Sequence, residues 1–215
     1  MSDQESRADS KSDSAIQQML SFIKEDLWGM TKRYFMDPIS GVQALSKDSS
    51  SAASLRAMTL MLLAALIFYL GIYIMLGDLS EQMEPIAHLF LLAVPITFML
   101  VMASISFVIK KVATSEGDFK QELTTGALFA FPIVFALVVV YALVGEVRSP
   151  AYLTRATNDS WVFSALLMYA FLMMVNTIMQ SMKASNVSER LSWYVSPAAV
   201  VLGFYLSAEI LTAAM

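Results

Sequence analysis

Residues 123–145, LTTGALFAFPIVFALVVVYALVG, decide the fold, because these 23 residues contain no charged side chain. A helix needs about 20 apolar residues to cross a hydrocarbon layer, and a soluble core helix of this length would show a polar stripe. Four similar runs lie at residues 57–76, 88–109, 161–182 and 191–208. The sequence therefore predicts an all-α fold, a polytopic integral membrane helix bundle with five transmembrane helices.

The composition agrees with a membrane protein and excludes several other classes. Apolar residues make up 57% of the 215, and the mean hydropathy is +0.62, well above ordinary globular usage. There is no Cys and only one His, His88, so a thiolate site is excluded and a haem or zinc centre is disfavoured. We expect no cofactor. The net charge of −4 does not suit a nucleic-acid binder.

Composition also divides the chain into three regions. Residues 1–14 are rich in Ser and Asp and are expected to form a disordered tail. Residues 15–55 predict a cytoplasmic amphipathic helix and a linker, with apolar residues at helical intervals opposite Lys32 and Arg33. This helix lies on the membrane surface with Trp28 at the boundary, or it packs on its own bundle or on a dimer partner. Residues 56–215 form the five-span domain.

The distribution of Lys and Arg predicts the orientation. With the amino terminus inside, cytoplasmic segments hold 12 of these residues and external segments hold 2, Arg148 and Arg155. By the positive-inside rule, the amino terminus is cytoplasmic and the carboxyl terminus external. Lys110 and Lys111, at the end of the second span, are expected to extend to the headgroups along their long stems.

Polar and small residues near the ends of the fourth and fifth spans are candidate site residues. Asn176, Thr177 and Gln180 lie on adjoining faces of one helix. They either hydrogen-bond to a neighbouring span or line a small cytoplasmic vestibule. Gly203 and Ser207, four residues apart, form a small-xxx-small pattern that predicts a close approach of two helices.

Two titratable residues are expected at the outer ends of spans. Glu209 is the only acid expected inside a hydrophobic helix, and an intramembrane carboxylate is a functional hypothesis such as a proton relay. Because it lies six residues from the end of the chain, an interfacial role is favoured. His88 occupies the mirror position on the second span. It is either a plain interfacial residue or a pH-sensitive partner of Glu209 or Glu84.

Prolines interrupt three of the spans. Pro132 lies about one third of the way into the third span, and Pro95 and Pro197 lie in the second and fifth. Such prolines are found in broken-helix transport sites, but these lack paired charges and an internal repeat. The 16 Met residues are better explained by flexible packing than by copper binding.

The layout resembles that of the Yip family, the Ypt/Rab-interacting membrane proteins and their prokaryotic relatives. The resemblance rests on YFMDPISGVQAL at residues 34–45, TTGALFAFPIVF at residues 124–135, and five closely spaced spans that leave the carboxyl terminus outside. Residues 26–29, DLWG, resemble the Asp-Leu-Tyr-Gly motif of eukaryotic members. Here they lie about 28 residues before the first span with no Pro after them, which argues against Rab binding.

The resemblance implies a non-enzymatic protein of a prokaryotic inner membrane that binds or scaffolds partners or organises the membrane, with no catalytic residues to transfer. Its expected partners are the lipid bilayer and a membrane protein or a second copy of the chain. The alternative is a small transporter or channel subunit that uses the polar ends of spans two, four and five. An enzyme is disfavoured, because no nucleophile-base pair, metal cluster or phosphate-binding loop occurs in the sequence.

Overall fold

A computed structural model describes residues 16–48, 50, 52–115, 117–145 and 161–214. Every regular element within these residues is a helix, and five of the helical segments are long and apolar enough to cross a membrane. The predicted all-α bundle with five spans is confirmed. The expected tail, residues 1–14, lies outside the residues that the structure describes.

Four of the spans are single helices. The first is α4 (Ala53–Leu76), which a short 3-10 helix, η2 (Gly77–Gln82), connects to the second, α5 (Pro85–Thr114). The fourth and fifth are α9 (Trp161–Ala184) and α10 (Glu189–Ala213). Each is longer than its apolar run, by two residues at the end of α9 and by about a turn or more in the other three.

The third span is broken into two helices, α6 (Phe119–Leu128) and α7 (Ala130–Val144). The break at Phe129 lies three residues before Pro132, which is buried in the first turn of α7. Proline has no N–H to donate and its ring crowds the preceding turn, so it commonly kinks a helix on its amino-terminal side. The two halves can therefore pack against different neighbours.

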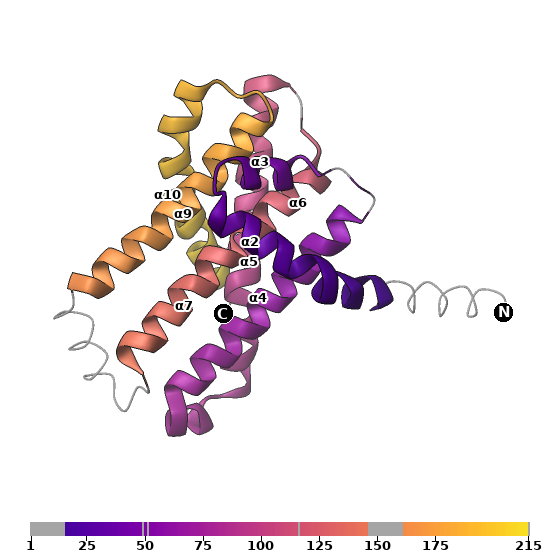
Figure 1. The fold of residues 1–215 in the computed structure, drawn as a ribbon. Coiled ribbons are helices and arrows are strands. Elements are labelled where there is room, and N and C mark those ends of the chain that lie inside the picture. Colours follow the sequence, from indigo (N-terminus) through magenta and orange to yellow (C-terminus); the bar gives the residue numbers. More distant parts are fainter. Residues whose placement is uncertain (1–15, 49, 51, 116, 146–160, 215) are drawn as a thin grey trace.

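The spans form a closed ring around α6. In Figure 1, α7 lies between α4 and α9, and α10 and α5 complete the ring behind them, each packed on the next. Helix α6 packs against both α4 and α5. Gly126 lets α6 approach α5 this closely, because it has no Cβ. A Cβ at that position would strike the backbone oxygen of Met99 in α5.

The amino-terminal segment is folded onto one end of the ring. Residues 16–21, a π-helical turn η1 (Phe22–Asp26) and α2 (Leu27–Met36) form one continuous helical stretch, and α3 (Ser40–Ser46) follows. Asp37 and Pro38 separate α2 from α3, as the restricted backbone before a proline favours. In Figure 1, α2 and α3 cross in front of the spans. Phe22, Tyr34 and Val42 are buried in the core.

The segment thus packs on its own bundle in this structure, as one of the sequence alternatives predicted. It also leaves Trp28 75% exposed, so an apolar side chain remains available at the outer face. A role at the membrane surface stays a prediction.

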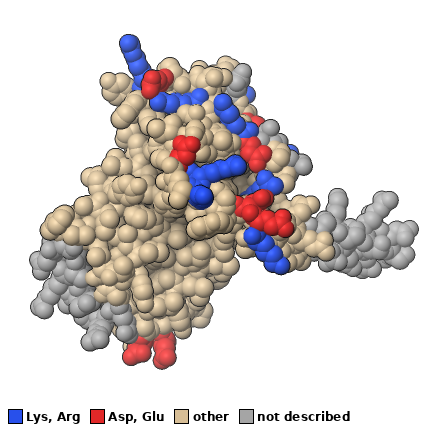
Figure 2. All heavy atoms as spheres, viewed as in Figure 1, with Lys and Arg blue, Asp and Glu red and all other residues tan. Residues whose placement is uncertain are grey.

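Charge is distributed unequally along the bundle. On the face in Figure 2, Lys and Arg gather toward the top, where α2 and α3 lie, and the charged side chains of described residues that appear at the bottom are acidic. All of the described Lys and Arg residues belong to the amino-terminal segment or to helix ends and connections on this side. We call it the basic end. It is defined by the amino-terminal segment, the α5–α6 connection and the α9–α10 connection.

Candidate functional site at the basic end

Three amide side chains join the amino-terminal segment to α9. Gln43 of α3 donates to the side-chain oxygen of Gln180 at 2.8 Å, and Gln180 donates to Asn176 at 3.1 Å. Asn176 then donates to the backbone oxygen of Pro38 at 2.8 Å. The chain of hydrogen bonds begins and ends on the amino-terminal segment. Asn176 and Gln180 therefore hold that segment and do not bond to a neighbouring span.

Thr177 makes a second connection to the amino-terminal segment. Its hydroxyl donates to the Met173 backbone oxygen at 2.9 Å and lies 2.7 Å from the hydroxyl of Tyr34. Since a Thr hydroxyl has one hydrogen, Tyr34 is the donor in this contact. The Tyr34 ring also packs on Phe131 of α7, with centroids 4.6 Å apart. Burial raises the pKa of Tyr34, so it stays a neutral donor throughout the physiological range.

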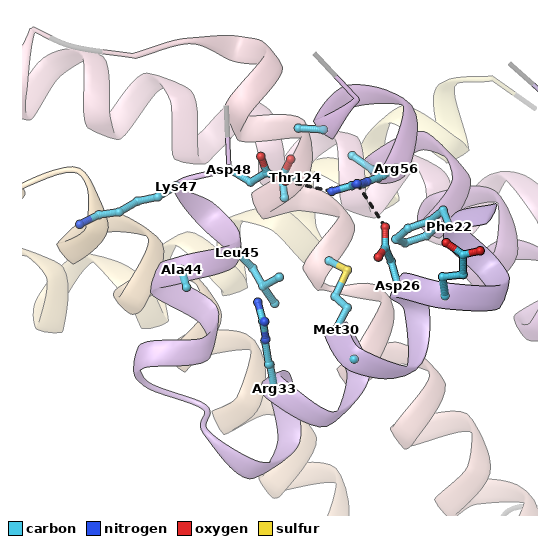
Figure 3. A pocket seen from close by; sticks show the side chains of 14 residues that line it. Phe22, Asp26, Met30, Arg33, Ala44, Leu45, Lys47, Asp48, Arg56 and Thr124 are labelled. Carbon is cyan, nitrogen blue, oxygen red and sulfur yellow. Dashed lines mark hydrogen bonds and ion pairs between the residues drawn. The ribbon is translucent and has the colours of Figure 1, made fainter. Parts of the chain in front are cut away.

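Docking of this segment encloses a cavity of about 580 Å³ between η1, α2, α3 and the first turns of α4 (Figure 3). Its floor includes Phe22, Met30 and Ala57, and its rim carries charged residues of both signs. The Arg33 side chain extends from α2 toward α3 in this view. The cavity therefore combines an apolar floor with a polar rim.

Ion pairs fix part of this rim and leave part of it free. Arg56 lies 3.2 Å from an Asp26 oxygen and 3.5 Å from an Asp48 oxygen, which ties α4 to η1 and to the end of α3. Arg33 and Glu25 have no ion-pair partner in the part of the chain that the structure describes. These two side chains are available to a ligand.

A residue with an unpaired buried hydroxyl also lines this space. Thr124 of α6 lines the cavity, is only 6% exposed, and its Oγ1 makes no hydrogen bond to any described residue. Burying a hydroxyl without a partner costs free energy, so buried polar groups are nearly always hydrogen-bonded. The position suits a polar atom of a bound group.

A second polar cluster lies deeper, where α5, α6 and α9 meet. Lys110 donates to both carboxylate oxygens of Glu122 and, at 2.7 Å, to Ser181. Ser106 donates to Glu122 at 2.6 Å, and Thr125 contacts Ser181 at 2.7 Å. All five side chains are buried. Every donor of the Lys110 ammonium group is therefore used within the protein.

This cluster corrects two expectations from the sequence. Lys110 does not extend to the headgroups: its side chain is 1% exposed and paired with Glu122. Glu209 is also not the only acid on a membrane-spanning segment, because Glu122 lies in α6 within the third span. The apolar run appeared to begin at Leu123, and the helix begins four residues earlier, at Phe119.

A small cavity of about 160 Å³ reaches Glu122 from the surface of the basic end. It lies between the α5–α6 connection and the α9–α10 connection, with Gly117, Gln121 and Asn186 among its lining residues. The buried carboxylate thus lies near a polar surface opening and not in the middle of the apolar core.

The small residues of the fifth span lie at a helix contact within the chain. Gly203 is buried, and a Cβ there would strike the sulfur of Met102 on α5 and approach Phe98. Ser207 is also buried, and its hydroxyl donates to the Gly203 backbone oxygen at 2.6 Å. The small-residue groove therefore faces α5.

The two residues expected at the outer ends do not meet in this structure. His88 Nδ1 lies 3.1 Å from the Tyr69 hydroxyl, and the imidazole packs against the rings of Tyr69 and Tyr73. Glu209 is exposed, and its carboxylate has no hydrogen-bond or ion-pair partner among the residues described; only its backbone oxygen accepts a bond, from the Thr212 hydroxyl. Pro132 lies at the kink and lines neither cavity.

Within the described ranges, no group of three or more Asp, Glu or His side chains could hold a metal ion. No protein-family model, curated protein or solved structure matches the chain.

Proposed function

We propose that this chain is a non-enzymatic integral membrane protein of Yip-like kind, and that it acts as a binding or scaffolding component. In this proposal the cavity of about 580 Å³ at the basic end receives a segment of a membrane-protein partner or of a second copy. The observation that carries it is Thr124, which lines this cavity and whose buried hydroxyl has no hydrogen-bond partner in the described part of the chain.

The charges of the cavity favour a polypeptide ligand. Arg33 and Glu25 offer one unpaired charge of each sign, while Phe22 and Met30 offer an apolar floor. A peptide supplies carbonyl and amide groups as well as side chains of either kind, so it can meet all of these groups together. In this proposal the basic end faces the cytoplasm of a prokaryotic cell, which the Lys and Arg count and the resemblance favour.

Site-specific photocrosslinking in cells tests the proposal. A photoreactive residue at Ala44, which is exposed and lines the cavity, should give a discrete protein adduct. The same residue at Ile86, which is 64% exposed near the opposite end, should not. Arg33→Glu should weaken the adduct, whereas Lys120→Glu, at an exposed Lys of the same end, should not. Identical adduct patterns from positions 44 and 86 would overturn the proposal.

A second candidate function, a small transporter or channel subunit, is favoured by the polar cluster. Lys110 and Glu122 are ionisable groups on membrane-spanning segments, and a cavity of about 160 Å³ reaches Glu122 from the basic end. Such groups often mark ion or proton pathways. However, the cluster is fully hydrogen-bonded, so it also serves as a contact among three spans.

Proton flux into proteoliposomes separates the two functions. For a scaffold we expect the same flux for the wild type, Glu122→Gln and protein-free vesicles. A flux that requires the Glu122 carboxylate, and that Glu209→Gln leaves unchanged, would favour transport over scaffolding.

A further inference from the structure

An apolar groove of about 330 Å³ lies between α4 and α7, beneath α2. Thr31 is the only lining residue with a polar side chain, and its hydroxyl donates to the Leu27 backbone oxygen at 2.8 Å. The groove therefore offers no free polar group. Because α4 and α7 belong to membrane-spanning segments, the groove opens among lipid chains. The walls are formed by Leu60, Leu63 and Ile67 of α4 and by Val134, Phe135 and Val138 of α7.

Helix α2 separates this groove from the polar cavity. Successive residues of an α-helix are turned by about 100°. Leu27, Thr31 and Phe35 therefore form one row, which lines the groove, while Met30 and Arg33, further around the helix, line the cavity. The same rotation places Trp28 and Lys32 next to this row of three residues, on the side that faces away from the bundle.

Trp28 and Lys32 have the chemistry of a headgroup contact. Trp28 is 75% exposed, and Trp side chains favour the boundary between hydrocarbon and water. Lys32 is exposed and has no ion-pair partner among the residues that the structure describes. An unpaired cation beside an apolar groove is complementary to an anionic phosphate joined to an apolar chain.

We propose that the groove beneath α2 binds one anionic phospholipid, with an acyl chain between α4 and α7 and the phosphate at Lys32 beside Trp28. The unpaired Lys32 selects an anionic lipid over a neutral one. The apolar walls need an acyl chain to fill the groove, so a phosphate compound without an acyl chain is not expected to bind. This site is distinct from the polar cavity, and it does not depend on the identity of a protein partner.

Native mass spectrometry of the delipidated full-length protein tests the proposal. Phosphatidylglycerol should be retained as one molecule per chain, and phosphatidylcholine of the same chain length at least tenfold more weakly. Glycerol 1-phosphate, which has no acyl chain, should not compete. Lys32→Gln should remove the preference for phosphatidylglycerol, while Lys120→Gln, at an exposed Lys outside the groove, should keep it.

A variant that fills the groove tests the acyl-chain part. Leu63→Phe combined with Val134→Phe should reduce retention of both lipids at least tenfold. Leu70→Phe, at a position of α4 that is 53% exposed and outside the groove, should not. Wild-type retention in the filled variant would overturn the proposal. A dimer that the filled variant loses while it keeps its lipid would identify a second copy as the occupant instead.

The wild-type chain provides a readout that does not depend on variants folding. Phosphatidylglycerol with a photoreactive diazirine on its acyl chain should label Ile67 and Val138 in the groove more than Leu172 and Val201. The latter two are also exposed apolar residues, on α9 and α10. Equal labelling of the two pairs would mean that the groove holds no specific lipid.

Discussion

The ammonium nitrogen of Lys110 lies 2.7 Å from one carboxylate oxygen of Glu122 and 2.9 Å from the other, and both side chains are 1% exposed. Removing one partner of a buried pair leaves an uncompensated charge, which costs more than the pair contributes. The ends of α5 and α6 are therefore coupled, because a change in either residue affects the other.

We expect Lys110→Met to lower the free energy of unfolding by about 3–5 kcal/mol, the usual cost of an unpaired buried charge. The double variant Lys110→Met/Glu122→Gln should recover more than half of this loss, because the Gln amide is neutral and still accepts a hydrogen bond from Ser106. Unfolding in detergent measures the free energy of unfolding of both variants. A single variant as stable as the wild type would mean that the Glu122 carboxylate is hydrated through the neighbouring cavity.

Tyr34→Phe should release the amino-terminal segment locally and leave the spans folded. The substitution removes one buried hydrogen bond, to Thr177, which contributes about 1 kcal/mol. Tryptic cleavage after Lys32 and Arg33 should become several-fold faster. As a control, Thr31→Val removes a hydroxyl that bonds only within α2, so it should change the cleavage rate little. Equal cleavage rates for Tyr34→Phe and the wild type would mean that the hydrogen bond to Thr177 does not hold the amino-terminal segment in place.

Two glycines should respond differently to the same methyl group. In Gly126→Ala the new Cβ meets the Met99 backbone oxygen, which cannot move without displacing α5. In Gly203→Ala it meets the sulfur of Met102, the flexible part of a side chain. We expect the thermal midpoint in detergent to fall more for Gly126→Ala. Gly203→Leu should cost about 1–3 kcal/mol, as overpacking of a fitted site does.

Gly29→Ala is a matched control for these variants. A Cβ at this position of α2 would meet nothing within 4 Å, and Ala is the better helix former. It should therefore leave the midpoint unchanged or raise it slightly. A lower midpoint would show that substitution of a helical glycine is harmful here whatever the space around it.

Reporter fusions test the orientation. Because the count of Lys and Arg is 12 against 2, a reporter before Met1 should be active in the cytoplasm and a reporter after Met215 outside it. A cytoplasmic signal from the carboxyl-terminal fusion would require an even number of spans and would remove the main basis of the family resemblance.

Hydropathy predicted the five spans because the membrane demands a long apolar run from each helix by itself, so no knowledge of neighbours is needed. The expected runs at residues 57–76 and 161–182 differ from α4 and α9 by four residues or fewer at either end. The same criterion missed the start of α6, since Glu122 is a charge that hydropathy assigns to a loop. Its buried partners, Lys110 and Ser106, make it acceptable inside the bundle.

The candidate site was harder to predict because it depends on which helices are neighbours. The polar side chains of Asn176, Thr177 and Gln180 predicted bonds to a neighbouring span or a vestibule, and neither alternative named the amino-terminal segment. Their hydrogen bonds to Pro38, Tyr34 and Gln43 join residues 137 to 143 positions apart. The cavity around Thr124 exists only because this docking occurs. Neither periodicity nor spacing within one segment carries that information.

The separation of 143 positions between Tyr34 and Thr177 imposes an order on biogenesis. At about 5–20 residues per second, the ribosome needs on the order of ten seconds to reach Thr177 after Tyr34 has been made. During this delay the amino-terminal segment has no α9 to bind, and its apolar residues are open to chaperones or to the lipid surface. Closure of the basic end is therefore a late event in assembly, after the fourth span has entered the membrane.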